Sequence, residues 1–387
     1  MHTFADYSRS FFALLILQTA IVLQSAGAEP EAIKIGATLA LTGKLAYLGQ
    51  AEKRGFELAL NELNGISTGG LDRDIPRIEL ITEDNGGDPK NAVSAVQKLL
   101  GADQIQILFS AFTHISEAIA PIAAKSGAVM LYTSSSREIV KRGPRIFRDS
   151  FDAGDGGVLL GQAIVKAKPA SVAILSEISE VCTLAFDSLR PQLETAGIPI
   201  KDTAEFNPGE KDFKSLLLRL RATGPAAMVI CAWRDEAEVM RQMKTMNLLG
   251  LPSFQFFAPF LPESDTPEIR QLYAENRTVS TWYGYPEQIQ KPAIAGFYAK
   301  YRSAYGEDPR PDSIFAYDDL RFLAAGARRC RKGGSGDLPA CLAAYLQTES
   351  FAGLDGPLKF DQNRLINRAV FPIQFTGGKW KPMGSAE

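Results

Sequence analysis

The sequence is poor in the residues on which most catalytic and metal sites depend. Its 387 residues include only two histidines, His2 and His114, and four cysteines. The cysteine spacings do not match those of zinc sites, so we expect no metal centre. A Ser-His-Asp triad would have to use His114, which is more simply interpreted as a polar residue near the start of a helix. We therefore expect neither an enzyme nor a cofactor-dependent protein.

Signatures of nucleotide and nucleic-acid binding are also missing. Gly36, Gly43 and Gly49 do not have the G-x-G-x-x-G spacing of a dinucleotide site, and the sequence has no G-x-x-x-x-G-K-[ST] loop. The G-x-S-x-G elbow of serine hydrolases is absent as well. The formal net charge is -2, and lysine and arginine are spread evenly along the chain. The basic surface of a nucleic-acid binder is therefore not expected.

Long apolar runs are absent except near the N-terminus. The run "FFALLILQTAIVL" (11–23) is shorter than the roughly 20 residues that cross a bilayer. The small residues that follow it, "AGA" (26–28), fit the cleavage rule of signal peptidase. We predict a cleavable signal peptide over residues 1–28 and a soluble mature protein in the periplasm. The alternative is an uncleaved hydrophobic anchor.

Export would permit disulfides between the four cysteines. Cys330 and Cys341 flank the glycine-rich link "RKGGSGDLPA" between two helical patterns, and we predict a local bridge there. Cys182 and Cys231 each follow an apolar strand. These two residues could lie close enough to form a bridge or could remain buried free thiols.

Short apolar runs alternate with helical patterns along the rest of the chain. This alternation predicts an α/β protein with parallel sheets covered by helices on both faces. The alternation occurs twice, which predicts two α/β units at about 31–149 and 152–281. The predicted strands are 33–41, 77–85, 105–110 and 128–133 in the first unit, and 171–177, 226–233 and 253–259 in the second.

Hydroxyl residues gather where two strands of the first unit end. Thr113 opens the helix after the third strand, and Ser134, Ser135 and Ser136 follow the fourth. Ligands of open parallel sheets bind beyond these carboxyl ends. Helix N-termini add free N–H groups and a partial positive charge. Helix capping is the alternative, but one cap accounts for only one serine. We therefore predict a site for an anion such as a carboxylate.

With the signal peptide removed, the chain resembles the type I periplasmic binding proteins of the leucine/isoleucine/valine-binding family, which serve branched-chain amino acid ABC transporters. The resemblance covers nearly all of the mature chain. The segments that carry it are "IKIGATLALTGKLAYLGQAEKRGFELALNELN", "EDNGGDPKNAVSAVQKLL", "GAVMLYTSSS", "PGEKDFKSLLLRLRATGPAAMVI" and "YRSAYGEDPRPDSIFAYDDL".

The resemblance implies two Rossmann-like lobes with parallel-sheet cores, joined by a hinge that the chain crosses three times. Ligand binding in this family closes the lobes about the hinge. We expect the crossings near residues 150, 282 and 360. Lobe 1 would then contain residues 29–150 and 282–360, and lobe 2 would contain residues 151–281 and 361–387.

The resemblance also implies roles for residues of the first lobe. Thr113 and Ser136 match positions whose hydroxyl groups hold the carboxylate of the ligand. Ser134 matches a position whose backbone carbonyl accepts the ligand's ammonium group. Tyr47 matches an aromatic residue of the pocket in the first loop.

The second lobe departs from the pattern of the amino acid binders. Val181 stands where many of them have tyrosine, Trp233 lies near another tyrosine position, and Phe260 replaces the acid that pairs with the ammonium group. A buried, unpaired ammonium group is costly. We therefore predict a ligand with a carboxylate and an apolar or aromatic body. A branched-chain or aromatic amino acid is the alternative, because the missing acid could be replaced by Glu177, Glu180, Asp235 or Glu263.

The expected partners follow from the resemblance. We expect a monomer whose closed, ligand-bound form is read by the permease and ATPase subunits of an ABC transporter, with no nucleic acid involved. A sensory or regulatory receptor subunit of the same fold, which binds an amide or a metabolite, is the alternative.

Overall fold

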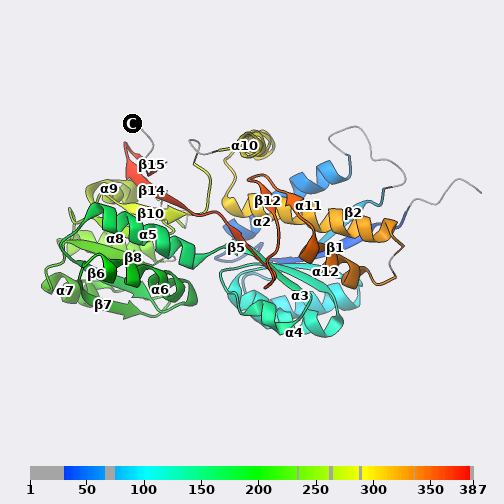
Figure 1. Ribbon diagram of the computed structural model, residues 1–387, viewed down its shortest axis with the longest axis horizontal. Helices are drawn as coiled ribbons and strands as arrows, with labels where there is room; N and C mark the ends of the chain where they lie inside the picture. The colour runs from blue at the N-terminus through cyan, green and yellow to red at the C-terminus, as the bar shows by residue number, and fades with distance from the viewer. Residues whose placement is uncertain are drawn as a thin grey trace, which may run out of the picture.

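The computed structural model describes residues 30–65, 75–232, 235–260, 265–286, 290–334 and 336–383, and these form two lobes (Figure 1). Each lobe is built on one largely parallel sheet with helices around it, which confirms the predicted α/β class. The signal peptide predicted over residues 1–28 lies outside the described residues. Within the described ranges, no helix has the length and apolar character needed to cross a membrane.

The sheet of the first lobe is parallel throughout, in the order β13-β5-β4-β3-β1-β2. Its strands are β1 (Ile33–Leu39), β2 (Ile78–Asp84), β3 (Ile107–Ala111), β4 (Val129–Thr133), β5 (Ile146–Phe151) and β13 (Leu365–Arg368). Every residue of β3 is buried, because helices cover both faces of the sheet. One face packs against α2 (Ala46–Leu63), α11 (Pro311–Lys332) and α12 (Leu338–Thr348), and the other against α3 (Pro89–Gly101) and α4 (Thr113–Ser126).

The sheet of the second lobe has the order β15-β14-β10-β9-β8-β6-β7. The strands from β10 to β7 pair in parallel, whereas β14 is antiparallel to both of its neighbours. The strands are β6 (Val172–Glu177), β7 (Ile200–Phe206), β8 (Ala227–Cys231), β9 (Ser253–Phe256), β10 (Val279–Trp282), β14 (Phe371–Thr376) and β15 (Lys379–Pro382). The helices are α5 (Ala153–Ala167), α6 (Glu180–Thr195), α7 (Lys214–Ala222), α8 (Glu236–Thr245) and α9 (Pro267–Glu275).

The chain passes between the two sheets after β5, after β10 and between β13 and β14. After β10 it returns to the first lobe through α10 (Pro292–Tyr305), which packs with α2 and α11. β13 pairs with β5, and β14 pairs with β10, so the third crossing lies between Arg368 and Phe371. The predicted crossing near residue 360 is therefore wrong, and β13 belongs to the first lobe. The segment was assigned to the second lobe because its four residues, "LINR", do not indicate with which sheet they pair.

Two close helix contacts fix the geometry of the lobes. A Cβ atom on Gly55 of α2 would lie 2.1 Å from the carbonyl oxygen of Ser313 on α11, so only glycine allows this approach. A Cβ atom on Gly157 of α5 would likewise lie 2.1 Å from the carbonyl oxygen of Ala185 on α6. The first contact brings the first turn of α11 against the middle of α2.

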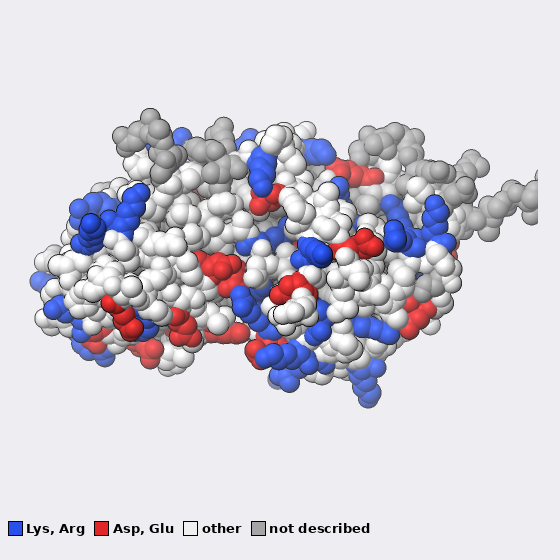
Figure 2. Space-filling model, viewed as in Figure 1, with Lys and Arg blue, Asp and Glu red and all other residues white. Residues whose placement is uncertain are grey.

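Both pairs of cysteines form disulfides. The predicted bridge between Cys330 and Cys341 joins the end of α11 to α12. Cys182 and Cys231, for which the sequence left two possibilities, are bridged and tie the first turn of α6 to the end of β8. On the face shown in Figure 2, basic and acidic side chains are interspersed over both lobes, as the small net charge of -2 would suggest.

Candidate functional site

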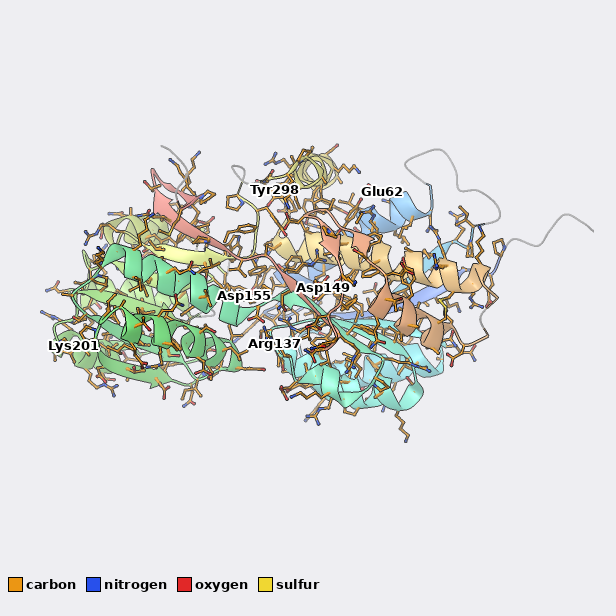
Figure 3. All side chains as sticks on the ribbon, in the orientation of Figure 1. Glu62, Arg137, Asp149, Asp155, Lys201 and Tyr298 are labelled. Atoms are coloured by element: carbon orange, nitrogen blue, oxygen red, sulfur yellow. A yellow bond between two sulfur atoms is a disulfide. The ribbon has the colours of Figure 1, made fainter. Side chains whose placement is uncertain are left out.

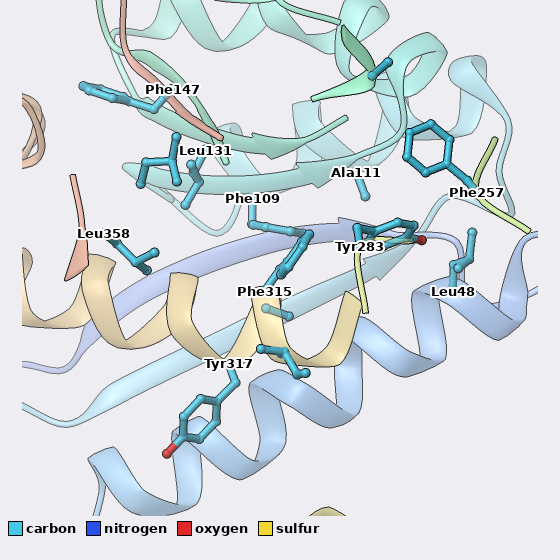
Figure 4. Packing of buried hydrophobic residues seen from close by; sticks show 14 of the residues in the cluster. Leu48, Phe109, Ala111, Leu131, Phe147, Phe257, Tyr283, Phe315, Tyr317 and Leu358 are labelled. Atoms are coloured by element: carbon cyan, nitrogen blue, oxygen red, sulfur yellow. The ribbon is translucent and has the colours of Figure 1, made fainter. Parts of the chain in front are cut away.

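A cavity of about 260 Å³ is lined by residues of both lobes. The first lobe contributes loops at the carboxyl ends of β3, β4 and β5, and the second contributes the start of α6 and the segment after β9. This is the edge of the sheet at which open α/β proteins bind ligands. Figure 4 shows four of the surrounding apolar residues close together, namely Leu48, Ala111, Phe257 and Tyr283.

Aromatic side chains form a large part of the cavity wall. Phe151, from the end of β5, stacks on Tyr283 with ring centroids 4.4 Å apart, and its ring lies 4.7 Å from that of Phe257. Phe112 and Phe260 line the cavity as well. Such a wall suits the flat or branched apolar part of a ligand. The rings pack closely against one another, which fixes the wall in position.

The first turn of α4 opens onto the cavity. The residue that precedes the helix is Phe112, and no side chain caps the exposed N–H groups of the first turn. Phe112 has a φ angle of 67°, in the left-handed region that non-glycine residues rarely occupy. Thr113, the first residue of the helix, lines the cavity. The uncapped amides and the helix dipole give this wall a partial positive charge.

Hydroxyl groups next to this helix are buried without partners. The Oγ1 atom of Thr133 and the Oγ atoms of Ser134 and Ser150 form no hydrogen bond within the described residues. All three residues line the cavity, as does Ser135, which is also buried. A buried polar group without a partner costs about 1–3 kcal/mol, so three of them on one wall are expected to meet a polar ligand.

Two predicted site residues do not line the cavity. The Oγ atom of Ser136 accepts a hydrogen bond of 3.4 Å from the amide of Glu138, which precedes the short 3-10 helix η2 (Ile139–Arg142). Tyr47 instead stacks under a cation, with the guanidinium of Arg310 5.1 Å from its ring centroid. Thr113, Ser134, Ser135, Val181 and Phe260 do line the cavity, whereas Trp233 lies outside the described residues.

Of the four acids that could replace the missing ammonium partner, Glu180 lines the cavity. Asp235 instead forms an ion pair of 2.7 Å with the Nζ atom of Lys211, and Glu177 is buried in β6 away from the lining. Glu263 lies outside the described residues.

The carboxyl group of Glu180 has an unfavourable environment for its negative charge. Burial raises its pKa, and the charge of Glu117 adds to this effect, while a hydrogen bond from the Ser136 hydroxyl opposes it. A cationic group of a ligand would relieve this cost. Glu180 is therefore the place in the second lobe where an ammonium group would find a partner.

Sequence reasoning missed two further acids, Glu52 on α2 and Asp312 at the start of α11, and both line the cavity. A signal for Glu52 was present in the sequence. It stands four residues after Leu48 and four before Phe56, on the buried face of an amphipathic helix, where an acid is out of place. Asp312 follows Pro311 in the first turn of a helix, where acidic residues are common, so its position held no such signal.

Contacts between the lobes lie beside the cavity. The Nη2 atom of Arg310 donates a hydrogen bond of 3.0 Å to the carbonyl oxygen of Phe260 in the second lobe. Arg137 of the first lobe pairs with Asp152, which caps α5 at the first crossing. Figure 3 places Arg137 at this junction between the lobes. Within the described ranges, no group of three or more potential metal ligands occurs.

Comparison with known proteins agrees with this architecture. A family model described as periplasmic binding protein matches residues 32–379. The Leu/Ile/Val-binding protein of Citrobacter freundii is 24% identical over 336 residues, which cover 85% of this chain and 86% of that protein.

Two solved structures share the fold at low sequence identity. A branched-chain amino acid transporter substrate binding protein from Streptococcus pneumoniae, in complex with isoleucine, has a TM-score of 0.75 and 20% identity, and the match covers 91% of this chain and 98% of that one. An ABC transporter solute binding protein from R. palustris, in complex with benzoate, has a TM-score of 0.74 and 20% identity, and the match covers 91% of this chain and 96% of that one.

Proposed function

This chain belongs to the periplasmic binding protein family, and we propose that it is the exported ligand-binding component of an ABC importer. In this proposal it binds a small carboxylate with an aromatic or apolar body between its two lobes. The lobes close on the ligand, and the membrane permease of the importer reads the closed form. The relatives and solved structures that share its family or fold include binders of branched-chain amino acids and of benzoate, which agrees with this ligand class.

One structural observation supports the proposal that the ligand has a carboxylate. Three buried hydroxyl groups, those of Thr133, Ser134 and Ser150, have no partner in the described part of the chain and lie on the cavity wall beside the uncapped start of α4 at Thr113. Hydroxyl and amide donors around a helix N-terminus bind an anion without a lysine or arginine in direct contact. The aromatic residues on the rest of the wall would hold the body of the ligand.

An amino acid ligand is the second candidate, and Glu180 favours it. Its carboxyl group lines the cavity, and its partial desolvation there raises its pKa, so a ligand ammonium group would stabilise its charged form. An aromatic acid without an amine would leave this carboxylate protonated or solvated. The two candidates share the carboxylate wall and differ only in whether Glu180 contacts the ligand.

Calorimetry with matched ligands tests the proposal. We expect benzoate, phenylacetate or an apolar amino acid to bind, and benzamide, which has the shape of benzoate without its charge, to bind much more weakly. Thr113→Val keeps the side-chain shape and removes one hydroxyl, and we expect it to weaken carboxylate binding about tenfold. Ser126→Ala, at the other end of α4, is the control, because its hydroxyl donates to the carbonyl oxygen of Ala123 and accepts from the amide of Ala128, away from the cavity lining.

The results separate the candidates. If amino acids bind and Glu180→Gln weakens them while leaving any binding of benzoate unchanged, the ligand is an amino acid. Equal affinity for benzoate and benzamide, or no loss in Thr113→Val, would contradict the carboxylate assignment.

A further inference from the structure

The cavity wall on the α2 side carries two acids, the buried Glu52 and the partly buried Asp312. Glu52 is only 3% exposed, and its Oε2 atom accepts no hydrogen bond within the described residues. The Oδ2 atom of Asp312 likewise has no hydrogen bond there, although it lies 3.6 Å from the Nε atom of Arg310. Both residues line the cavity, and each has a buried carboxyl oxygen without a hydrogen bond in the described ranges.

This end is separate from the carboxylate wall. Glu52 and Asp312 come from α2 and α11, which pack on one face of the first sheet, whereas α4 and its uncapped first turn lie on the other face. The cavity extends around the end of the sheet and is lined from both sides. A ligand whose carboxylate lies at Thr113 would therefore direct the rest of its body toward the acids.

The charges at this end do not balance. Arg310 forms an ion pair with Asp312, and in the described part of the chain no cation lies within 4 Å of Glu52. Tyr283 and Tyr47 are the other titratable groups near this cluster. Burial, followed by the charge of Asp312, raises the pKa of Glu52 well above its usual value. Its surroundings thus disfavour the charged form of Glu52, and its Oε2 atom is left without a hydrogen-bond partner in the described residues.

Packing alone gives no reason for an acid at this position. Glu52 lies in the apolar stripe of α2 between Leu48 and Phe56, and the contact at Gly55 presses this helix against α11. A leucine or methionine here would extend the core without the cost of burying a carboxyl group, which is about 1–3 kcal/mol by mutational measures. The position fits a contact with a ligand, where the polar group is satisfied on binding.

We propose that Glu52 and Asp312 form a second polar subsite, which accepts a hydrogen bond from a hydroxyl or amino group on the ligand at the end away from its carboxylate. The proposal rests on the proposed function, since it presumes that a carboxylate is bound at the start of α4. It narrows the predicted ligand class from any acid with an apolar part to acids that carry a hydrogen-bond donor at the end opposite the carboxylate. An apolar ligand would leave both carboxyl oxygens buried and unsatisfied.

The test measures by calorimetry the affinity of the wild type and of each variant for a series of matched ligands. The probes are benzoate, 4-methylbenzoate, 3- and 4-hydroxybenzoate and 4-aminobenzoate. The methyl compound matches the size of the hydroxyl compound without a donor, and the hydroxyl and amino compounds distinguish the two donors. The variants are Glu52→Leu, which removes the acceptor, and Glu52→Gln, which keeps an amide oxygen. Glu57→Gln is the control on the same helix, because Glu57 pairs with Lys53 and Tyr305 outside the cavity lining.

We expect a hydroxyl or amino compound to bind the wild type about tenfold or more tightly than 4-methylbenzoate. Glu52→Leu should abolish this preference, Glu52→Gln should keep part of it, and Glu57→Gln should keep it whole. If acids bind but no donor compound is preferred by the wild type, the subsite proposal is overturned and the proposed function stands. This comparison needs no variant, so a folding defect of Glu52→Leu does not affect it. If none of the carboxylates or amino acids binds, the proposed function fails as well.

Discussion

The Nε atom of Arg148 donates a hydrogen bond of 2.7 Å to the carbonyl oxygen of Ser134, the residue that begins the serine-rich loop of the cavity. The same guanidinium donates to the carbonyl oxygen of Phe151 at 2.5 Å and to Oδ1 of Asn367 at 3.1 Å. Arg148 is fully buried, and burial lowers its pKa to about 10. One side chain thus connects the site loop with the strands at the first and third crossings between the lobes.

Arg148→Met should destabilise the fold and weaken ligand binding. The variant leaves the buried carbonyl oxygen of Ser134 and two partly buried acceptors without this donor, so we expect a loss of about 2 kcal/mol or more in urea unfolding. Arg145→Met is the control, because Arg145 is partly exposed and should change stability by less than about 1 kcal/mol. Equal losses in the two variants would contradict the role assigned to Arg148.

Arg368, the last residue of β13, holds three buried carboxylates together. Its guanidinium lies 2.5 Å from Asp149, 3.0 Å from Asp318 and 3.7 Å from Asp319. Arg368→Met would leave Asp149 and Asp319 buried without this cation and Asp318 with only Arg321 at 3.8 Å, and we expect a loss of about 3–5 kcal/mol at neutral pH. Burial raises the pKa of Asp318 and of Asp319, so protonation at lower pH should recover part of the loss. A variant equally unstable at pH 5 and pH 8 would refute this account.

Glu52 should make stability depend on pH. Its folded-state pKa lies well above the usual 4.5, so the folded state binds more protons than the unfolded state between those two values. The contribution of Glu52 to the free energy of unfolding therefore falls as pH rises through that window, by up to about 1.4 kcal/mol per pH unit. Glu52→Gln removes this dependence. Its melting temperature relative to wild type should rise from pH 5 to pH 8, whereas that of Glu57→Gln should stay level.

The two disulfides should differ in their contribution to stability. Cys182 and Cys231 are separated by 49 residues and Cys330 and Cys341 by 11. Chain-entropy arguments give about 4 kcal/mol for the longer loop and about 3 kcal/mol for the shorter one. Replacing each pair by alanine and measuring denaturant unfolding tests the order. A larger loss from the Cys330–Cys341 pair would show that native-state effects outweigh loop closure.

Much of the fold could be predicted from the sequence because it depends on local patterns. Buried parallel strands need continuous apolar runs, and the helices between them need one apolar face, so the alternation identified two α/β units. Strand β13, which the sequence placed in the wrong lobe, has only four residues, and its position comes from pairing with β5 rather than from its own composition. Such pairing between distant segments leaves little trace in either one.

The candidate site was predicted only in part for a similar reason. The hydroxyl residues after β3 and β4 were visible in the sequence, but their directions were not. Ser134 and Ser135 line the cavity, whereas the hydroxyl of Ser136, one residue further, accepts a hydrogen bond from the backbone ahead of η2. Adjacent side chains in a turn point in different directions, and backbone geometry alone decides which of them reaches a ligand.

The sequence by itself determined the two-lobed α/β plan, the position of the hydroxyl-rich strand ends and the short Cys330–Cys341 link, because each depends on residues that are close together in the chain. The tertiary structure decided that Glu52 and Asp312 meet at one end of the cavity and that Cys182 meets Cys231. These contacts join residues far apart in the chain, and they exist only because the packing of helices on each sheet, as at Gly55, brings distant segments within bonding distance.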